Sequence, residues 1–494
     1  MSLDAAVREA ARSTPDAVAV RDADGPVTYA ELDRRSRALA EELAARGVGR
    51  GDRVVLWAPK SADLVAATQA VLRAGAVYVP VHGDAPAARV RALAEDCSAA
   101  AVVASDGRVP ALAGLPAPAG VLPLGLARGP VRGTALPAPA GDGDPAYILY
   151  TSGSTGRPKG VTVSHGAALA FVGWAAAEVG ARPDDVFANH ASFGFDLSVL
   201  DLYAAFRAGA SVFLVAEDRA HDPHALVDLL RRERISVWYS VPSVLTAMVR
   251  RGGLTEHPAP ERLRAVLFAG EPFPVRYVRE LAAWTGARLL NLYGPTETNV
   301  CAFHEVRAAD LERDRPAPIG RAACGDLLEV LRDDGAAAGP GEVGELVVAG
   351  PTLMLGYWGH PPLDGPHRTG DLVRVLPDGL LDYVGRRDSM LKVRGHRIEP
   401  HEVEAVLESH PGVARAAVVC AGSGLEAALT AFLVPAPGGA GALSVRRHLV
   451  ERLPPGMVPD LIRFVDELPR NANGKIDRAG LTAAAEQMTN GEAP

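Results

Sequence analysis

The residues most capable of chemistry form the run YTSGSTGRPKGV, from Tyr150 to Val161. It carries five hydroxyl groups, three glycines and one lysine. Small residues let the backbone approach a ligand closely, and successive N–H groups and hydroxyls can then surround polyphosphate oxygens beside the lysine charge. The run follows the strand-like AYILY and precedes VTVSH. We therefore predict a tight turn between two strands that binds phosphate, in preference to a flexible Gly/Ser loop.

The spacing of this run differs from that of the P-loop NTPases. Their motif requires GxxxxGK[ST] leading into a helix, whereas here Pro158 stands where N–H groups should be donated. The order TSGSTGxPKG instead resembles the phosphate loop of the adenylate-forming superfamily, which includes nonribosomal peptide adenylation domains, acyl-CoA synthetases and luciferases. The resemblance assigns ATP binding to Thr151, Ser152, Gly153, Ser154, Thr155, Gly156 and Lys159.

A second motif, NLYGPTETNVCA, begins at Asn291 and resembles the superfamily's NxYGPTE. Taken alone it would be a Gly-Pro turn with an acidic residue in a first helical turn. The resemblance implies that Tyr293 stacks on adenine, that Thr296 offers its hydroxyl to the α-phosphate, and that Glu297 holds Mg²⁺, a cation that prefers oxygen ligands. The further ATP contacts implied are Gly270, Asn291 and Gly294.

Three later segments extend the resemblance towards the carboxyl end. HRTGDLV resembles YRTGDL and assigns the ribose hydroxyls to Asp371. DYVGRRDSMLKVRGHRIEPHEVE resembles GRxDxQxKxRGxRIExxEIE, which adds Tyr383 and Arg386 to the nucleotide site; it departs from the pattern where methionine replaces glutamine and histidine replaces tyrosine. NANGK resembles PxTxNGKxDR, in which the lysine enters the active site, so Lys475 is the expected catalytic residue together with Thr296 and Glu297.

The length of the chain predicts more than one domain. It has 494 residues, whereas single cores stop growing near about 250–300. Alternating strand and helix patterns before residue 300 predict βαβ-type parallel sheets. With the resemblance, the fold class expected is α/β: a large amino-terminal domain over 1–387 with a β-barrel-like subdomain, and a small mobile α+β domain over 388–494, with the hinge at Asp388.

The segment FDLSV places Asp196 before a predicted helix, where an aspartate would usually be a cap. In amino-acid-activating members of the superfamily the matching aspartate holds the substrate's ammonium group. We predict that role here, because a buried ammonium requires a paired anion. The other substrate-binding residues implied by the resemblance are Leu197, Leu200, Tyr239, Leu267, Ala269, Leu292, Val300 and Cys301.

This residue set predicts a small apolar substrate. Four leucines would reduce the pocket volume, and no charged side chain is present to pair an ionic substrate side chain. The ordered set resembles the pocket of L-prolyl-AMP ligases. That resemblance implies activation of L-proline with MgATP, release of pyrophosphate and transfer to the phosphopantetheine thiol of a separate peptidyl carrier protein, for pyrrole formation in antibiotic or other natural-product biosynthesis. A small helper protein is a further candidate partner.

Composition excludes several other classes. With 51 basic and 59 acidic side chains the net charge is −8, which disfavours a nucleic-acid partner. No apolar run suits a membrane span, and four scattered cysteines without a CxxC pair fit a reducing cytoplasm. No GGxS-type carrier segment follows, so a free-standing enzyme is expected. The alternatives are activation of another small apolar amino acid, an acyl- or aryl-CoA synthetase, and a non-catalytic protein that recruits a carrier.

Overall fold

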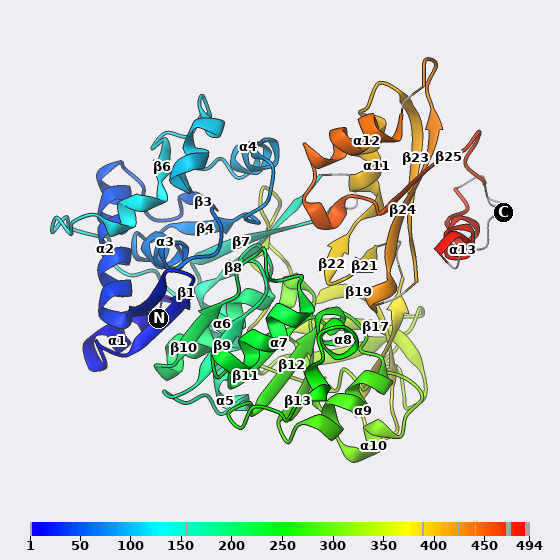
Figure 1. Ribbon diagram of the computed structural model, residues 1–494, viewed down its shortest axis with the longest axis horizontal. Coiled ribbons are helices and arrows are strands. Elements are labelled where there is room, and N and C mark those ends of the chain that lie inside the picture. Colours follow the sequence, from blue (N-terminus) through cyan, green and yellow to red (C-terminus); the bar gives the residue numbers. More distant parts are fainter. Residues whose placement is uncertain are drawn as a thin grey trace. The chain divides into compact units, whose positions relative to one another are not determined.

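The computed structural model describes residues 2–153, 157–387, 390–422, 424–439, 441–470 and 476–489. The chain divides into two compact units (Figure 1). The first contains Met1–Gly83, Val90–Tyr150 and Gly160–Arg387, and the second contains Asp84–Arg89, Thr151–Lys159 and Asp388–Pro494. The second unit thus includes two short segments that lie inside the range predicted for the large domain.

A nine-stranded sheet forms one half of the first unit. Its spatial order is β15-β14-β13-β12-β11-β9-β10-β1-β2, and the strands from β13 to β1 run parallel. The strands are β1 (Val18–Asp22), β2 (Gly25–Thr28), β9 (Val186–Asn189), β10 (Ser211–Leu214), β11 (Val237–Ser240), β12 (Ala265–Ala269), β13 (Arg288–Tyr293), β14 (Ala302–Glu305) and β15 (Arg321–Ala322).

A seven-stranded sheet of order β18-β8-β7-β4-β3-β5-β6 forms the other half. Its strands are β3 (Arg53–Trp57), β4 (Val77–Pro80), β5 (Ala101–Ala104), β6 (Val121–Pro123), β7 (Pro145–Thr151), β8 (Lys159–Ser164) and β18 (Gly356–Tyr357). The Ala/Pro/Gly-rich stretch before the phosphate loop reads as a surface excursion, but β6 pairs with β5 and buries Leu122. A few apolar residues that pair and pack at the edge of the sheet are therefore enough to form a strand within this low-complexity stretch.

Helices cover the sheets of the first unit: α1 (Ala5–Ser13), α2 (Tyr29–Ala45), α3 (Ala62–Arg73), α5 (His165–Glu178), α6 (Leu197–Ala208), α7 (Pro223–Arg232), α8 (Pro242–Arg250), α9 (Val275–Trp284) and α10 (Ala308–Leu311). α4 (Ala87–Asp96) begins within a segment of the second unit. Thr28 followed three residues later by Glu31 is a sequence pattern that predicts the start of a helix, and α2 does start there, with the Thr28 hydroxyl accepting a hydrogen bond from the Glu31 N–H. Short 3₁₀ turns are η1 (Asp106–Leu112), η2 (Leu124–Arg128), η3 (Leu254–Glu256) and η4 (Thr296–Thr298).

The two faces of the nine-stranded sheet belong to different cores. Trp238 and Phe268 pack with α7, α8 and α9, which lie on the face seen in Figure 1. Tyr239 and Leu267, each adjacent in sequence to one of these residues, point the other way into the largest core, which also includes residues of α2, α3, α5 and α6 and of the seven-stranded sheet. This alternation follows from the two-residue period of a strand.

The first unit also contains a four-stranded antiparallel sheet. Its order is β16 (Leu327–Leu331), β17 (Val343–Ala349), β19 (His367–Val375) and β20 (Leu381–Arg386). Its apolar face, with Leu346, Val348 and Val373, packs around Tyr293 and Cys301. The sheet thereby borders the end of β13.

The second unit has a three-stranded sheet with helices on both faces. The strands are β23 (Val413–Ala421), β24 (Ala428–Pro435) and β25 (Leu461–Phe464), beside the hairpin β21 (Leu391–Val393) and β22 (His396–Ile398). The helices are α11 (Pro400–Glu408), α12 (Ala442–Val450) and α13 (Arg478–Thr489), with η5 (Gly424–Glu426) and η6 (Pro455–Met457). α11 and α12 pack on one face and α13 on the other.

Candidate functional site

Four of the predicted pocket residues lie on one face of the nine-stranded sheet. Tyr239 of β11 is opposite Leu267 of β12. Ala269, two residues further along β12, is opposite Leu292 of β13. Residues paired across neighbouring strands, or two apart along a strand, share a face, so these side chains form one buried apolar wall. The wall stands at the carboxyl ends of parallel strands, where α/β sheets bind ligands.

Asp196 does not cap the helix that follows it. Its backbone is already in the α region and its side chain makes no capping hydrogen bond to α6. Its carboxylate instead accepts a hydrogen bond from the Thr296 hydroxyl at 2.6 Å. The structure therefore joins the residue predicted to bind the substrate's ammonium to the one predicted to contact the α-phosphate, although they are a hundred positions apart. Because a threonine has one O–H, the predicted phosphate contact requires that bond to be exchanged.

Two buried tyrosines surround this carboxylate. Burial, and next the charge of Asp196, raises the pKa of both Tyr147 and Tyr239, so both stay neutral. The Tyr147 hydroxyl donates to the amide oxygen of Asn299 at 3.1 Å. Asn299 has a φ of +50°, which is rare for a residue with a side chain. Sequence reasoning missed this pair; an asparagine at the end of the TETN turn is the signal that could have indicated it.

The turn that carries Thr296 and Glu297 depends on Gly294. A Cβ at that position would stand 1.6 Å from the carbonyl oxygen of Asn299, so only glycine fits. Glu297 is buried and accepts a hydrogen bond from the Tyr357 hydroxyl at 2.7 Å. Among the described residues no group of three or more His, Cys, Asp or Glu could hold a metal ion. A single carboxylate does fit Mg²⁺ that is shared with phosphate oxygens.

Asp371 connects Tyr293 and Arg386, two residues that are predicted to bind the nucleotide. Its carboxylate accepts hydrogen bonds from the Tyr293 hydroxyl and, at 3.0 Å, from Arg386. Arg386 also donates to the carbonyl of Thr369. The ring of Tyr383 lies 6.5 Å from that of Tyr293. A carboxylate has about four acceptor positions, so Asp371 keeps the capacity to accept from ribose hydroxyls while it is held by both partners.

Of the other predicted residues of the first unit, some pack in the same core as the wall and others lie apart from it. Gly270 directly follows β12, and the Asn291 amide donates to the carbonyls of Ala317 and Pro318. Leu197 and Leu200 begin α6 and pack into the largest core together with Val300. Cys301 packs instead in the core beside Tyr293, where burial raises its pKa to about 12.

The described part of the phosphate loop belongs to the second unit. There the Ser152 hydroxyl donates to the Arg397 carbonyl at 2.7 Å and accepts from the Glu399 N–H at 2.9 Å. A Cβ on Gly153 would meet the Arg157 carbonyl oxygen at 1.9 Å, so the loop requires glycine at this position. Thr151 ends β7 and Lys159 begins β8. Ser154, Thr155, Gly156, Asp388 and Lys475 lie outside the described residues.

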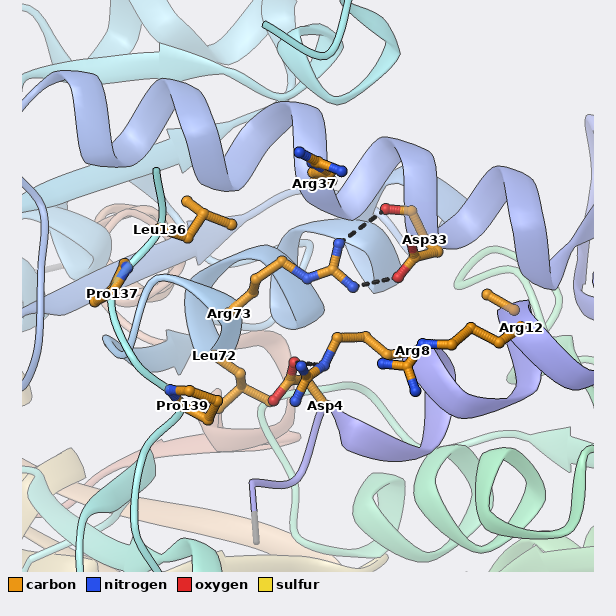
Figure 2. Close-up of a pocket in the computed structure, with 11 residues that line it drawn as sticks. Asp4, Arg8, Arg12, Asp33, Arg37, Leu72, Arg73, Leu136, Pro137 and Pro139 are labelled. Atoms are coloured by element: carbon orange, nitrogen blue, oxygen red, sulfur yellow. Dashed lines mark hydrogen bonds and ion pairs between the residues drawn. The ribbon is translucent and has the colours of Figure 1, made fainter. Parts of the chain in front are cut away.

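A cavity of about 370 Å³ lies between α1, α2 and α3 and contains none of the predicted site residues (Figure 2). Figure 2 shows Arg73 reaching Asp33 and Arg8 reaching Asp4. The other two arginines of the lining pair with Glu9 and Glu41. Each guanidinium is thus matched by a carboxylate. The Arg73–Asp33 pair joins α3 to α2, whereas the other three pairs each lie within one helical segment, so we interpret the cluster as structural.

Comparison with known proteins places this geometry in a family. The family model described as AMP-binding enzyme matches residues 7–358, and the model of the AMP-binding enzyme C-terminal domain matches residues 402–475. The chain belongs to the AMP-binding enzymes. The predicted membership of the adenylate-forming superfamily is therefore confirmed. The predictions of an ATP-dependent ligase and of ATP as its cosubstrate are confirmed with it.

Two curated relatives match nearly the whole chain. The L-proline–[L-prolyl-carrier protein] ligase of Pseudomonas fluorescens is 48% identical over 96% of this chain and 97% of its own length. The ligase of the same name from Streptomyces coelicolor is 43% identical, covering 93% and 92%. Among solved structures, o-succinylbenzoate CoA synthetase from Bacillus subtilis matches with a TM-score of 0.86 and 25% identity over 97% of this chain and 98% of that one.

These matches confirm the predicted fold class, a mixed α/β protein with a large amino-terminal and a smaller carboxy-terminal domain. The roles of individual site residues and the predicted domain boundaries stay predictions. In the part of the chain that the structure describes, no helix has the length and apolarity needed to cross a membrane.

Gly294 offers a direct test of the turn. We expect Gly294→Ala to weaken nucleotide binding about 100-fold, because the new methyl group must displace Asn299 and with it Thr296 and Glu297. Isothermal calorimetry with ATP measures this. Gly286→Ala is the matched control, since nothing lies within 4 Å of its Cβ position. Equal affinities for both variants would contradict the role of the turn.

Proposed function

We propose that this enzyme activates L-proline with MgATP to form prolyl-AMP and pyrophosphate, and transfers the prolyl group to the phosphopantetheine thiol of a separate peptidyl carrier protein. The observation that carries the proposal is the 48% identity, over nearly the full length of both chains, to a ligase of that name. The wall formed by Tyr239, Leu267, Ala269 and Leu292 supports it, since it offers a proline ring apolar contacts and no charge.

In this proposal the substrate's secondary ammonium binds the carboxylate of Asp196. The neighbouring Tyr147 and Tyr239 remain neutral, so they do not add negative charge that would attract a larger cationic side chain. Before the nucleotide binds, the hydrogen bond from Thr296 orients the carboxylate. The amino acid's own carboxylate is then directed away from Asp196 by charge repulsion, towards the nucleotide site.

The adenylation step brings two anions together, so catalysis must consist mainly of alignment and charge neutralisation. Lys475 would contact the substrate carboxylate and the α-phosphate, while the phosphate loop holds the leaving pyrophosphate. Asp371, held by Tyr293 and Arg386, would bind the ribose hydroxyls. Mg²⁺ bound by Glu297 and the phosphates would supply further neutralisation of the triphosphate.

The thioester step requires a thiol and a change of catalytic groups. We propose Asp388 as the hinge about which the small domain rotates. This rotation would remove Lys475 from the active site and bring in the surface that admits the pantetheine arm. The prolyl thioester would serve pyrrole formation in natural-product biosynthesis, with a small helper protein as a candidate partner. Four cysteines that are all free fit a reducing cytoplasm as the location.

The experiment that tests this function is amino-acid-dependent exchange of labelled pyrophosphate into ATP. We expect L-proline to give the dominant signal across the proteinogenic amino acids and simple carboxylic acids. Closely sized substrates such as valine and pipecolate should give weaker signals, because an apolar pocket separates neighbours by only about 1–3 kcal/mol. A dominant signal from another amino acid would keep the reaction and reject proline, and activity only with acids that lack an amine would reject the ammonium site.

The carboxylate of Asp196 can be tested without changing its size. Asp196→Asn should lower proline-dependent exchange at least about 100-fold, since it leaves the ammonium group without a paired charge. ATP affinity should stay within about twofold, because the nucleotide contacts remain. Asp196→Glu, which keeps the charge, should retain part of the activity. Proline turnover at the wild-type rate in Asp196→Asn would refute the assignment.

Lys475 can be tested by separating binding from chemistry. Lys475→Ala should slow adenylation by about 10²–10³-fold, the usual cost of losing one group that stabilises the transition state. ATP binding, followed by calorimetry, should change little. Lys475→Arg retains the charge in a planar form and should recover only part of the rate. Unchanged adenylation in the alanine variant would remove this lysine from the mechanism.

A further inference from the structure

Lysine is scarce in this protein. Of the 51 basic side chains only four are lysines, and the rest are arginines. Lys159, Lys392 and Lys475 belong to segments that the superfamily resemblance covers. The fourth, Lys60, belongs to none of the motifs discussed above. An ammonium group is more compact than a guanidinium and directs its three donors differently, so the surroundings of Lys60 can show what a lysine does there.

Lys60 stands at the end of a loop between β3 and α3, one residue before Ser61, which caps that helix. A cation is disfavoured beside a helix amino terminus, because the helix dipole is positive there. The ammonium is compensated by three carbonyl oxygens, those of Asn189, His190 and Ala191, at 3.2, 2.7 and 3.3 Å. The Lys60 ammonium thus donates to three acceptors in a single turn of the chain.

The turn 189–191 is followed in the chain by Asp196, whose carboxylate is proposed to bind the substrate's amine. Asn189 ends β9 and pairs across the sheet with Tyr239 of the pocket wall. Five residues after Ala191 comes Asp196. The turn has further contacts: the Asn189 carbonyl accepts from the Val215 N–H at 3.1 Å, its side-chain amide donates to Asp201 at 3.3 Å, and the His190 ring contacts the carbonyl of Ala220 at 2.9 Å. Lys60 follows β3 of the neighbouring seven-stranded sheet, so its three hydrogen bonds connect that sheet to the turn after β9.

We propose that Lys60 is a positioning residue for amino-acid activation: its ammonium holds the turn 189–191 so that Asp196 meets the substrate's amine. The inference rests on the proposed function. A lysine suits this position, since its compact ammonium directs three donors at the carbonyls of one turn.

The charge of Lys60 is itself sensitive to pH. Burial lowers its pKa to about 8, against the opposing attraction of Glu217 and Asp201. The other group facing it, His190, has its pKa lowered to about 4 by burial and then by Lys60, so it stays neutral above pH 6. Asp201, on α6, has its pKa raised by burial. Above about pH 8 the lysine loses a proton, one donor and its charge, so the turn is held less tightly.

The experiment measures pyrophosphate exchange at varied proline and varied ATP in wild-type enzyme, Lys60→Met and Lys60→Arg. Lys60→Met removes the donors at nearly equal length and should raise the KM for proline about tenfold or more, while the KM for ATP changes less than about twofold. Arg219→Met, which changes an exposed basic residue, is the control and should match wild type. A wild-type proline KM in Lys60→Met would overturn the proposal.

The pH profile separates positioning from a merely structural role. For wild type, kcat/KM for proline should fall above about pH 8, the pKa of Lys60. Arginine stays protonated, so Lys60→Arg should lose this decline even if its overall rate is lower. Asp201→Asn removes a charge that raises the pKa of Lys60, so the decline should move to lower pH. Its disappearance in Asp201→Asn, or its persistence in Lys60→Arg, would assign the titration elsewhere and overturn the proposal.

These outcomes are distinct from failure of the proposed function. If wild-type enzyme gives no proline-dependent exchange, the proposed substrate is wrong. If wild type is active and Lys60→Met unfolds, which thermal melting would show, the pH profiles of wild type and Lys60→Arg still decide the role of this lysine.

Discussion

The hydrogen bond between Thr296 and Asp196 is the interaction on which the arrangement of the site depends. One partner begins helix α6 and the other lies in the turn after β13, so the bond joins the predicted amino-acid and nucleotide segments. It can form only because Gly294 lets the Asn299 carbonyl approach the chain closely and fold the turn back. The residues predicted to bind the two substrates are thus held next to each other by one contact.

Burial of charge is the second constraint on this part of the protein. A carboxylate at Asp196 and a cation at Lys60 are both partly withdrawn from water, and each is compensated by directed polar groups: a hydroxyl for the first and three carbonyl oxygens for the second. The tyrosines beside Asp196 are neutral because burial raises the pKa of each. The predicted pocket therefore combines one negative group with an apolar wall, a pattern suited to the small amino acid that we propose as substrate.

Side chains alternate between the two faces of the nine-stranded sheet, so each face can have a different role. Side chains such as Trp238 and Phe268 fix α7, α8 and α9, while Tyr239 and Leu267 on the opposite face form the pocket wall. A substitution in the wall can change the substrate without disturbing the packing of those three helices. This separation is a physical reason why enzymes of one family, which share a fold, can differ in the acid that they activate.

The sequence by itself determined the family, the alternating α/β pattern and the cap of α2. These features depend on the local spacing of residues and on the order of motifs along the chain, both of which can be read from one sequence. It also predicted the residues of the pocket, whose individual roles stay predictions. Only the tertiary structure decided that Asp196 bonds to Thr296 and leaves α6 uncapped, that Tyr147 holds Asn299, that β6 extends the sheet, and that Lys60 meets the turn 189–191. Each of these contacts joins residues far apart in the chain, and local propensity carries no information about which distant partners a buried polar group will find.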